Sequence, residues 1–237
     1  MKTLRPISAE DKSLVNLVIS SLREAILNGY FEPGEKLDQD KIAEELKVSR
    51  TPIREALKVL ASNGFVEIQS FRGAFIPVIN LQDILDVYEI RWIIEPEIVR
   101  QSTPNIPNEI LDNCEHMLNQ AIQCELSNKE RLLYEADERF HAAIFSYCDN
   151  HVFTEILEKL NNRIVRVRTF ALHRTGQTLI STHDEHMGII KAIRTRQAEE
   201  ACRLMEAHLR NSAKRIVSYI DPHYDLMNYP ILGGSGG

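Results

Sequence analysis

The pattern of apolar and polar positions divides the chain into a first third of mixed pattern and a long helical remainder. Apolar residues recur every three or four positions over residues 12–27, which predicts an amphipathic helix. Asp38 is placed to cap a short helix that ends at Leu46, and a third helix is expected over 50–62 after the N-cap Ser49. The runs FVEIQ and AFIPV, on either side of SFRG, predict a short β-hairpin.

From residue 81 onward the pattern is helical almost to the end of the chain. Two sequences have the form of capping boxes, Ser127 with Glu130 and Thr182 with Glu185. Pro96 lies inside the first of these helices and is expected to kink or split it. Such helices with short connections favour an antiparallel bundle. The six predicted helices span 81–101, 107–126, 128–147, 151–174, 182–196 and 198–220.

Length and composition fit two globular domains. The chain has 237 residues, of which 43% are hydrophobic, and we expect domains at 1–79 and 80–222. A tail follows at 223–237, and its GGSGG ending is typical of an artificial linker. The sequence lacks an apolar run that would span a bilayer and a signal peptide, which indicates a soluble cytoplasmic protein without a membrane partner. The four cysteines have neither metal-binding nor disulfide spacing.

The elements predicted for the first domain follow the order of a winged helix-turn-helix. The net charge of the chain is −6, but the first 79 residues hold as many basic as acidic side chains, so a basic face there remains compatible with DNA. Arginines in the first turn of the third helix would reach guanine in the major groove, while a solvated basic helix end is the simpler alternative. The hairpin tip would contact the minor groove or a phosphate. The candidate DNA-binding residues are Arg50, Thr51, Arg54, Arg72 and Gly73.

A second group of residues has the chemistry of a metal site. Asp137 and His141 stand four residues apart, on the same side of a helix, and a core histidine satisfied by its carboxylate neighbour is the simplest interpretation. His186 and His208 lie beside apolar helix faces and could bring three imidazoles and one carboxylate to one point, with His183 as an alternative ligand. This set suits a divalent ion such as zinc, manganese, nickel or iron(II) and leaves one or two coordination positions open.

Together these motifs resemble the GntR family of bacterial transcriptional regulators. LKVSRTPIREAL, NGFVEI and RGAFIPV are similar to its DNA-binding domain, although Asp40 stands where many members carry an arginine. YEIRWIIE, D-x-x-x-H, EH-x-x-I-x-x-AI and M-x-x-HL follow the order of the FadR subfamily with an FCD effector domain, and six bundle helices favour its VanR-like branch. The resemblance implies a homodimer that binds a palindromic operator and responds to a small carboxylate. It also implies a divalent metal, with zinc as the first candidate, on Asp137, His141, His186 and His208.

Arginines on the bundle helices are candidates for holding the effector, because guanidinium pairs with carboxylate through two hydrogen bonds. We expect Arg91 and Arg168 in this role, while Arg163 and Arg166 are equally well explained as a solvated face. Two other functions remain open: a sensor in which the metal ion is the signal, and a metalloenzyme that activates water or oxygen. No further acid or base stands at motif spacing, so we expect a regulator, taken to be a repressor, and no enzyme.

Overall fold

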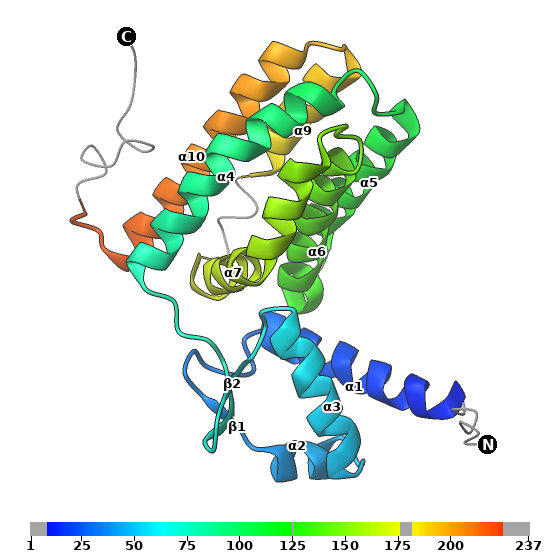
Figure 1. The fold of residues 1–237 in the computed structure, drawn as a ribbon, viewed down its shortest axis with the longest axis vertical. Coiled ribbons are helices and arrows are strands. Elements are labelled where there is room, and N and C mark those ends of the chain that lie inside the picture. The colour runs from blue at the N-terminus through cyan, green and yellow to red at the C-terminus, as the bar shows by residue number, and fades with distance from the viewer. Residues whose placement is uncertain (1–8, 125, 176–181, 225–237) are drawn as a thin grey trace. The chain divides into compact units, whose positions relative to one another are not determined.

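The computed structural model describes residues 9–124, 126–175 and 182–224 and divides the chain into two compact units, Met1–Val78 and Ile79–Gly237. Figure 1 shows that the first unit combines helices with a small sheet and that the second is built of helices. The mainly helical class is therefore confirmed. The GGSGG ending and most of the predicted tail lie outside the described residues. Within the described part of the chain, no helix is both long and apolar enough to cross a membrane.

The first unit has the predicted elements of a winged helix-turn-helix. α3 packs against α1, α2 and β2, and β3 pairs antiparallel with both other strands. The strand β1 was not predicted, because two residues carry too little alternation to form a pattern. The helices are α1 (Ala9–Leu27), α2 (Gln39–Glu45) and α3 (Arg50–Ser62), and the strands β1 (Lys36–Leu37), β2 (Glu67–Gln69) and β3 (Gly73–Phe75) lie in the order β1-β3-β2.

The N-termini of α2 and α3 show which of the predicted N-cap residues make capping hydrogen bonds. Asp38 caps α2 as predicted, since its side chain accepts hydrogen bonds from the backbone N–H groups of Asp40 and Lys41. Ser49 occupies the predicted N-cap position of α3, but its side chain makes no capping hydrogen bond. The tight turn between α2 and α3 therefore depends on the backbone rather than on a serine cap, and α3 starts at Arg50 with its first arginine in the first turn.

The second unit contains six helices among the described residues, and their bounds agree with the predicted ranges to within three residues. α4 and α10 lie side by side along the bundle (Figure 1). α6 and α7 follow each other in the chain and also pack together. The helices are α4 (Leu81–Ser102), α5 (Asn108–Gln123), α6 (Leu126–Phe145), α7 (His151–Thr175), α9 (His183–Arg194) and α10 (Ala198–Ile220).

The structure bears on three local predictions for this unit, and the two capping boxes among them are wrong. Of the two outcomes expected at Pro96, a split helix does not occur, because α4 continues through this residue. Ser127 lies inside α6, which begins at Leu126, so it cannot be the N-cap. Thr182 precedes α9, but its backbone is helical, with φ −82° and ψ −14°, and its side chain makes no capping hydrogen bond. The carboxylate of Glu185, the other half of the expected box, lies 2.9 Å from Nδ1 of His208 instead. A capping box does form at α4, where Asn80 and Asp83 exchange hydrogen bonds.

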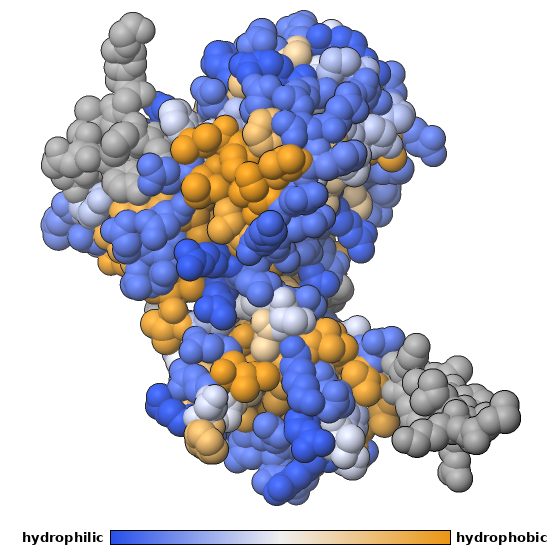
Figure 2. Space-filling model, in the orientation of Figure 1, coloured by the Kyte–Doolittle hydropathy of each residue, from blue (hydrophilic) through white to orange (hydrophobic). Residues whose placement is uncertain are grey.

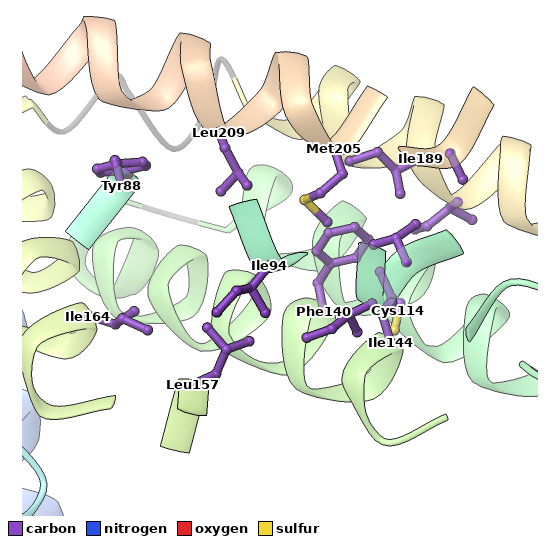
Figure 3. Packing of buried hydrophobic residues seen from close by; sticks show 14 of the residues in the cluster. Tyr88, Ile94, Cys114, Phe140, Ile144, Leu157, Ile164, Ile189, Met205 and Leu209 are labelled. Carbon is purple, nitrogen blue, oxygen red and sulfur yellow. The ribbon is translucent and has the colours of Figure 1, made fainter. Parts of the chain in front are cut away.

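The apolar core of the second unit surrounds Phe140, a fully buried residue of α6. Figure 3 shows Ile144 of the same helix, Ile189 of α9 and Met205 of α10 gathered near its ring. The next residue along α6 is His141, which is itself only 2% exposed. The packing that fixes Phe140 therefore also fixes the helix that carries the first candidate metal ligands.

Candidate metal centre and nucleic-acid interface

Three helices of the second unit bring four buried, potentially metal-binding side chains together. Asp137 and His141 lie one turn apart on α6, His186 lies on α9, and His208 lies on α10; these four residues are called the tetrad. One potential ligand atom of each lies within 4.8 Å of the other three. The alternative ligand His183 is placed elsewhere, with its Nε2 atom 3.0 Å from the side-chain oxygen of Asn119.

The donor atoms of the tetrad have the spacing expected around one small ion. Nε2 of His186 lies 3.4 Å from Nε2 of His208 and 3.5 Å from Oδ1 of Asp137. Nε2 of His141 lies 3.8 Å from the same carboxylate oxygen. Two ligands that each stand about 2 Å from a shared zinc ion are separated by roughly 3–4 Å. The Nε2 atom of His141 is buried and makes no hydrogen bond within the described residues, and a cation at the tetrad would provide its partner.

Two acids outside the tetrad face the second nitrogen of two imidazole rings. Oε2 of Glu95, on α4, lies 2.9 Å from Nδ1 of His141. Oε2 of Glu185, on α9, lies 2.9 Å from Nδ1 of His208. Metal-binding histidines commonly have such a carboxylate at the outer nitrogen, where it fixes the tautomer and the orientation of the ring. Both acids therefore favour a ring state in which Nε2 is directed at the tetrad and free to bind a metal.

Each acid in and around the tetrad also has an arginine. The closest nitrogen–oxygen distances in these three pairs are 2.6, 3.2 and 2.9 Å. Three carboxylates and three guanidinium groups leave the centre without net charge as long as its imidazoles are neutral. The pairs, in the order of the distances, are Arg91 with Glu95, Arg168 with Asp137 and Arg215 with Glu185.

These pairs hold the pKa of the acids low, and burial lowers the pKa of His141 and His186. Burial by itself would raise the pKa of Asp137, but the positive charge of Arg168 and the neighbouring histidines hold that pKa well below its usual range. Burial lowers the pKa of His141 to about 4, although Glu95 acts in the opposite direction, and burial also takes the pKa of His186 well below its ordinary value. At neutral pH these two rings can therefore bind a metal without first losing a proton.

A cavity of about 560 Å³ lies beside the tetrad and is lined mainly by α6 and α7. Its lining includes His141 and Arg168 but, among the described residues, not the other three members of the tetrad. Arg91 does not line this cavity and is 3% exposed in its pair with Glu95. Arg163 is exposed, Arg166 is half-buried, and neither of them lines the cavity. Arg168 is thus the predicted effector arginine that the structure places at a cavity.

In the first unit, the start of α3 presents arginines to the surface. The side chains of Arg50 and Arg54 are 71% and 64% exposed, and Thr51 is exposed between them. The opposite side of α3, which includes Ile53 and Leu57, is buried in the core of the unit. This division leaves the polar face of the helix accessible to a major groove, as the sequence predicts.

Asp40 of α2 forms an ion pair with Arg50. Both side chains are exposed, so solvent screens the pair and its contribution to stability is small. Its location is more informative than its strength, because the acid stands where many members of the resembled family carry an arginine. The pair was not foreseen because the two residues are ten positions apart and only the turn between α2 and α3 brings them together.

The hairpin between β2 and β3 carries the remaining candidate DNA contacts. Arg72 is exposed at its tip, and Gly73 has a φ of 110°, a conformation that favours glycine. Phe71 also has a positive φ, of 62°, and its side chain is fully exposed. Apolar wing residues can insert between base steps in a minor groove, so Phe71 joins the candidates. The exposed aromatic residue between Ser70 and Arg72 was the sequence signal for it.

Comparison with known proteins matches both units to families. Residues 14–76 match the model of bacterial regulatory proteins of the gntR family, and residues 86–211 match that of the FCD domain. The Nta operon transcriptional regulator of Aminobacter aminovorans is 29% identical over 192 residues, which cover 81% of this chain and 89% of the relative. The HTH-type transcriptional repressor GlaR of Escherichia coli (strain K12) is 29% identical over 198 residues, covering 79% and 89%.

Solved structures share the fold at lower identity. A putative transcriptional regulator GntR from Rhodococcus sp. RHA1 has a TM-score of 0.67 and 24% identity, and the match covers 90% of this chain and 100% of that one. Escherichia coli McbR/YncC also has a TM-score of 0.67, with 18% identity over 89% of this chain and 98% of that one. At these identities the likeness concerns the fold alone.

Proposed function

Because the chain belongs to the GntR family of bacterial regulatory proteins, in the FadR-like subfamily with an FCD domain, we propose that this DNA-binding transcriptional regulator is a metabolite-responsive repressor. It binds a palindromic operator as a homodimer and responds to a small organic acid in the second unit. A DNA partner implies a cytoplasmic location. The repressor GlaR among its relatives supports repression, and the regulatory role of these relatives favours a sensor over a metalloenzyme.

The observation that carries the effector part of this proposal is the charge balance around the tetrad. Asp137, His141, His186 and His208 would hold a divalent ion, with zinc as first candidate, which when bound would supply a Lewis-acidic position for an oxygen ligand. The three acid–arginine pairs are already balanced, so they do not offset two added positive charges. An organic anion is therefore favoured, and the cavity at His141 and Arg168 gives its carboxylate a place to bind.

A second copy of the chain is proposed to cover the exposed face of α4. Ile93 is 58% exposed in the middle of this helix, with Ile90 and Trp92 partly buried next to it. Figure 2 shows apolar side chains gathered over α4 in the second unit. A two-fold-related pair of chains would bury this face and would present two copies of α3 to the two half-sites of a palindrome.

Replacing either Arg50 or Arg54 by alanine is expected to weaken operator binding by about 1–3 kcal/mol and to relax base preference at one position per half-site. The reason is the loss of a two-point contact between guanidinium and guanine. Fluorescence anisotropy with a duplex selected from a random DNA pool, together with repeated selection by each variant, measures both effects. Arg203→Ala, an equal change of charge in the second unit, should leave binding unchanged. Wild-type affinity and base preference in both α3 variants would contradict the assignment.

Asp40→Asn tests the same pair of helices, α2 and α3, with an expected gain in operator affinity rather than a loss. The substitution removes the partner of Arg50 together with one negative charge near the phosphates, so operator binding should become several-fold tighter at low salt. If binding instead weakened as much as in Arg50→Ala, Asp40 would hold Arg50 in the orientation that reads the base.

Effector and operator are expected to oppose each other. A bound organic acid should weaken operator affinity by about 1–3 kcal/mol, and operator DNA should weaken affinity for the acid by the same factor, because the coupling of two binding equilibria is reciprocal. Titrations of the zinc-loaded protein in both orders test this. If operator affinity instead followed free metal concentration with no response to any organic acid, the protein would be a metal sensor.

A further inference from the structure

The turn of the hairpin between β2 and β3 carries a phenylalanine where the backbone favours glycine. The backbone N–H of Arg72 donates to the carbonyl oxygen of Gln69 at 3.1 Å, which closes a four-residue β-turn. Phe71 is the third residue of this turn, and its φ is 62°. A bulky side chain is strained in this left-handed region, whereas glycine and asparagine adopt it readily. The turn would therefore form more easily with either of those residues than with the one it has.

The ring of Phe71 gains nothing from packing that would offset this strain. Its side chain is fully exposed. Phe75 in β3, by contrast, is half-buried, and the guanidinium carbon of Arg72 lies 5.4 Å from the centre of its ring. An apolar ring that stays in water also forgoes the free energy that burial provides. Backbone strain and an uncovered aromatic side chain thus coincide at one residue, a combination that points to a partner outside the chain.

The charges around the ring indicate which kind of partner covers it. Arg72 follows Phe71 directly, and residues 69–73 contain no acid. Lys36 of β1 lies against the same turn, since its Cε atom is 3.3 Å from the position that a Cβ atom on Gly73 would occupy. Positive side chains next to an exposed apolar ring complement DNA, whose phosphates border the grooves and whose base stack accepts apolar wedges. The arginines of α3 in the same unit are exposed for the same partner.

We infer that Phe71 acts as a wedge that enters the minor groove, inserts between two stacked base pairs and kinks the operator. Arg72 and Lys36 bind phosphates beside the opened step. Unstacking is easiest at pyrimidine–purine steps, TA and CA/TG, so each half-site should carry such a step where α3 makes no contact. The ring then contributes sequence preference without any hydrogen bond to a base. This inference rests on the proposed operator binding and adds a deformation of the DNA to it.

Selection of operator duplexes from a random DNA pool, followed by measurement of their bending, tests the wedge. Energy transfer between dyes at the duplex ends should show a bend of about 20–90° at each half-site when the wild type binds. The fluorescence of 2-aminopurine placed at the selected step should rise, because the base loses its stacking. The selected sequences should be enriched in TA or CA/TG steps. A straight duplex with the wild type bound would overturn the inference and leave operator binding intact, whereas failure to select any sequence would overturn both.

Phe71→Gly removes the ring and suits the backbone at the same time. Glycine adopts a φ of 62° without strain, so the unbound protein should melt at no lower temperature than the wild type. The bend and the preference for a pyrimidine–purine step should disappear, and affinity for the selected operator should fall by about 10-fold, as for loss of one aromatic–base stack. Phe71→Leu keeps an apolar wedge and should keep most of the bend.

Ile68→Ala is the matched control on the same hairpin. Ile68 is a 52% exposed apolar residue of β2 outside the turn, so this variant should bind and bend the operator like the wild type. Persistence of the bend and of the step preference in Phe71→Gly would overturn the inference. Dimerisation lost in Phe71→Gly with the bend retained would overturn it too, because the ring would then cover a second copy of the chain.

Discussion

Replacing His208 or His141 by alanine is expected to abolish metal binding and to lower the melting temperature below that of the zinc-loaded wild type. The ion would tie α6, α9 and α10 together and bind the folded state far better than the unfolded chain. A ligand at about 1,000 times its dissociation constant stabilises a protein by about 4 kcal/mol. For a domain of this size each kcal/mol corresponds to about 2–4 °C, so the expected loss is roughly 8–16 °C. Elemental analysis and thermal melting with and without a chelator measure the two effects.

The chelator distinguishes loss of metal from a general defect in packing. It should lower the melting temperature of the wild type but leave the two tetrad variants unchanged. His183→Ala removes a histidine of the same helix as His186 that lies outside the tetrad, and it should keep both metal and chelator sensitivity. The metal affinity of Glu185→Gln should lie between that of the wild type and that of the tetrad variants, because loss of an outer carboxylate typically weakens a metal site by about 10–100-fold. Full metal occupancy in either tetrad variant would refute the ligand set.

The helices and the burial of the tetrad residues could be predicted because both depend on local spacing. The bundle helices follow from apolar periodicity, and their ranges agree within three residues. Asp137 and His141 share one turn of α6, so their common direction follows from helical geometry. His186 and His208 each stand beside apolar positions of their own helices, which predicts burial but not the helix they meet. Their convergence followed from packing that spacing alone leaves undetermined.

Two acids that face the tetrad, Glu95 and Glu185, were missed because they act between helices. Glu185 fits the pattern of a capping box with Thr182, yet its carboxylate bonds to His208 and Arg215 of α10. The spacing of a capping box was present in the sequence, but the carboxylate of Glu185 pairs with side chains of α10, which compensate its negative charge. Glu95 stands one turn after Arg91 on α4, a spacing that on most helices indicates a solvated pair. In this protein the pair is buried instead. Its burial depends on the helices packed over it, which the spacing within α4 does not indicate.

Replacing Arg91 by alanine is expected to destabilise the protein by about 3–5 kcal/mol even when no metal is present, because it leaves the carboxylate of Glu95 buried without its positively charged partner. Glu95 is 1% exposed, and despite the opposing effect of burial, the charge of Arg91 holds its pKa well below the usual range. Removal of the arginine forces this acid either to stay ionised in an apolar environment or to take up a proton. Chemical denaturation in the presence of a chelator measures the loss without a contribution from the tetrad.

Arg100→Ala is the matched control on the same helix. Arg100 also pairs with two acids, Glu97 and Glu199, but its side chain is 38% exposed, so its loss should cost no more than about 1 kcal/mol. The double replacement Arg91→Met with Glu95→Leu removes both buried charges and should recover most of the stability lost in Arg91→Ala, while metal binding stays weak because His141 has lost its outer carboxylate. Near wild-type stability of Arg91→Ala, combined with loss of carboxylate binding, would instead assign Arg91 to the effector, as the sequence alone predicts.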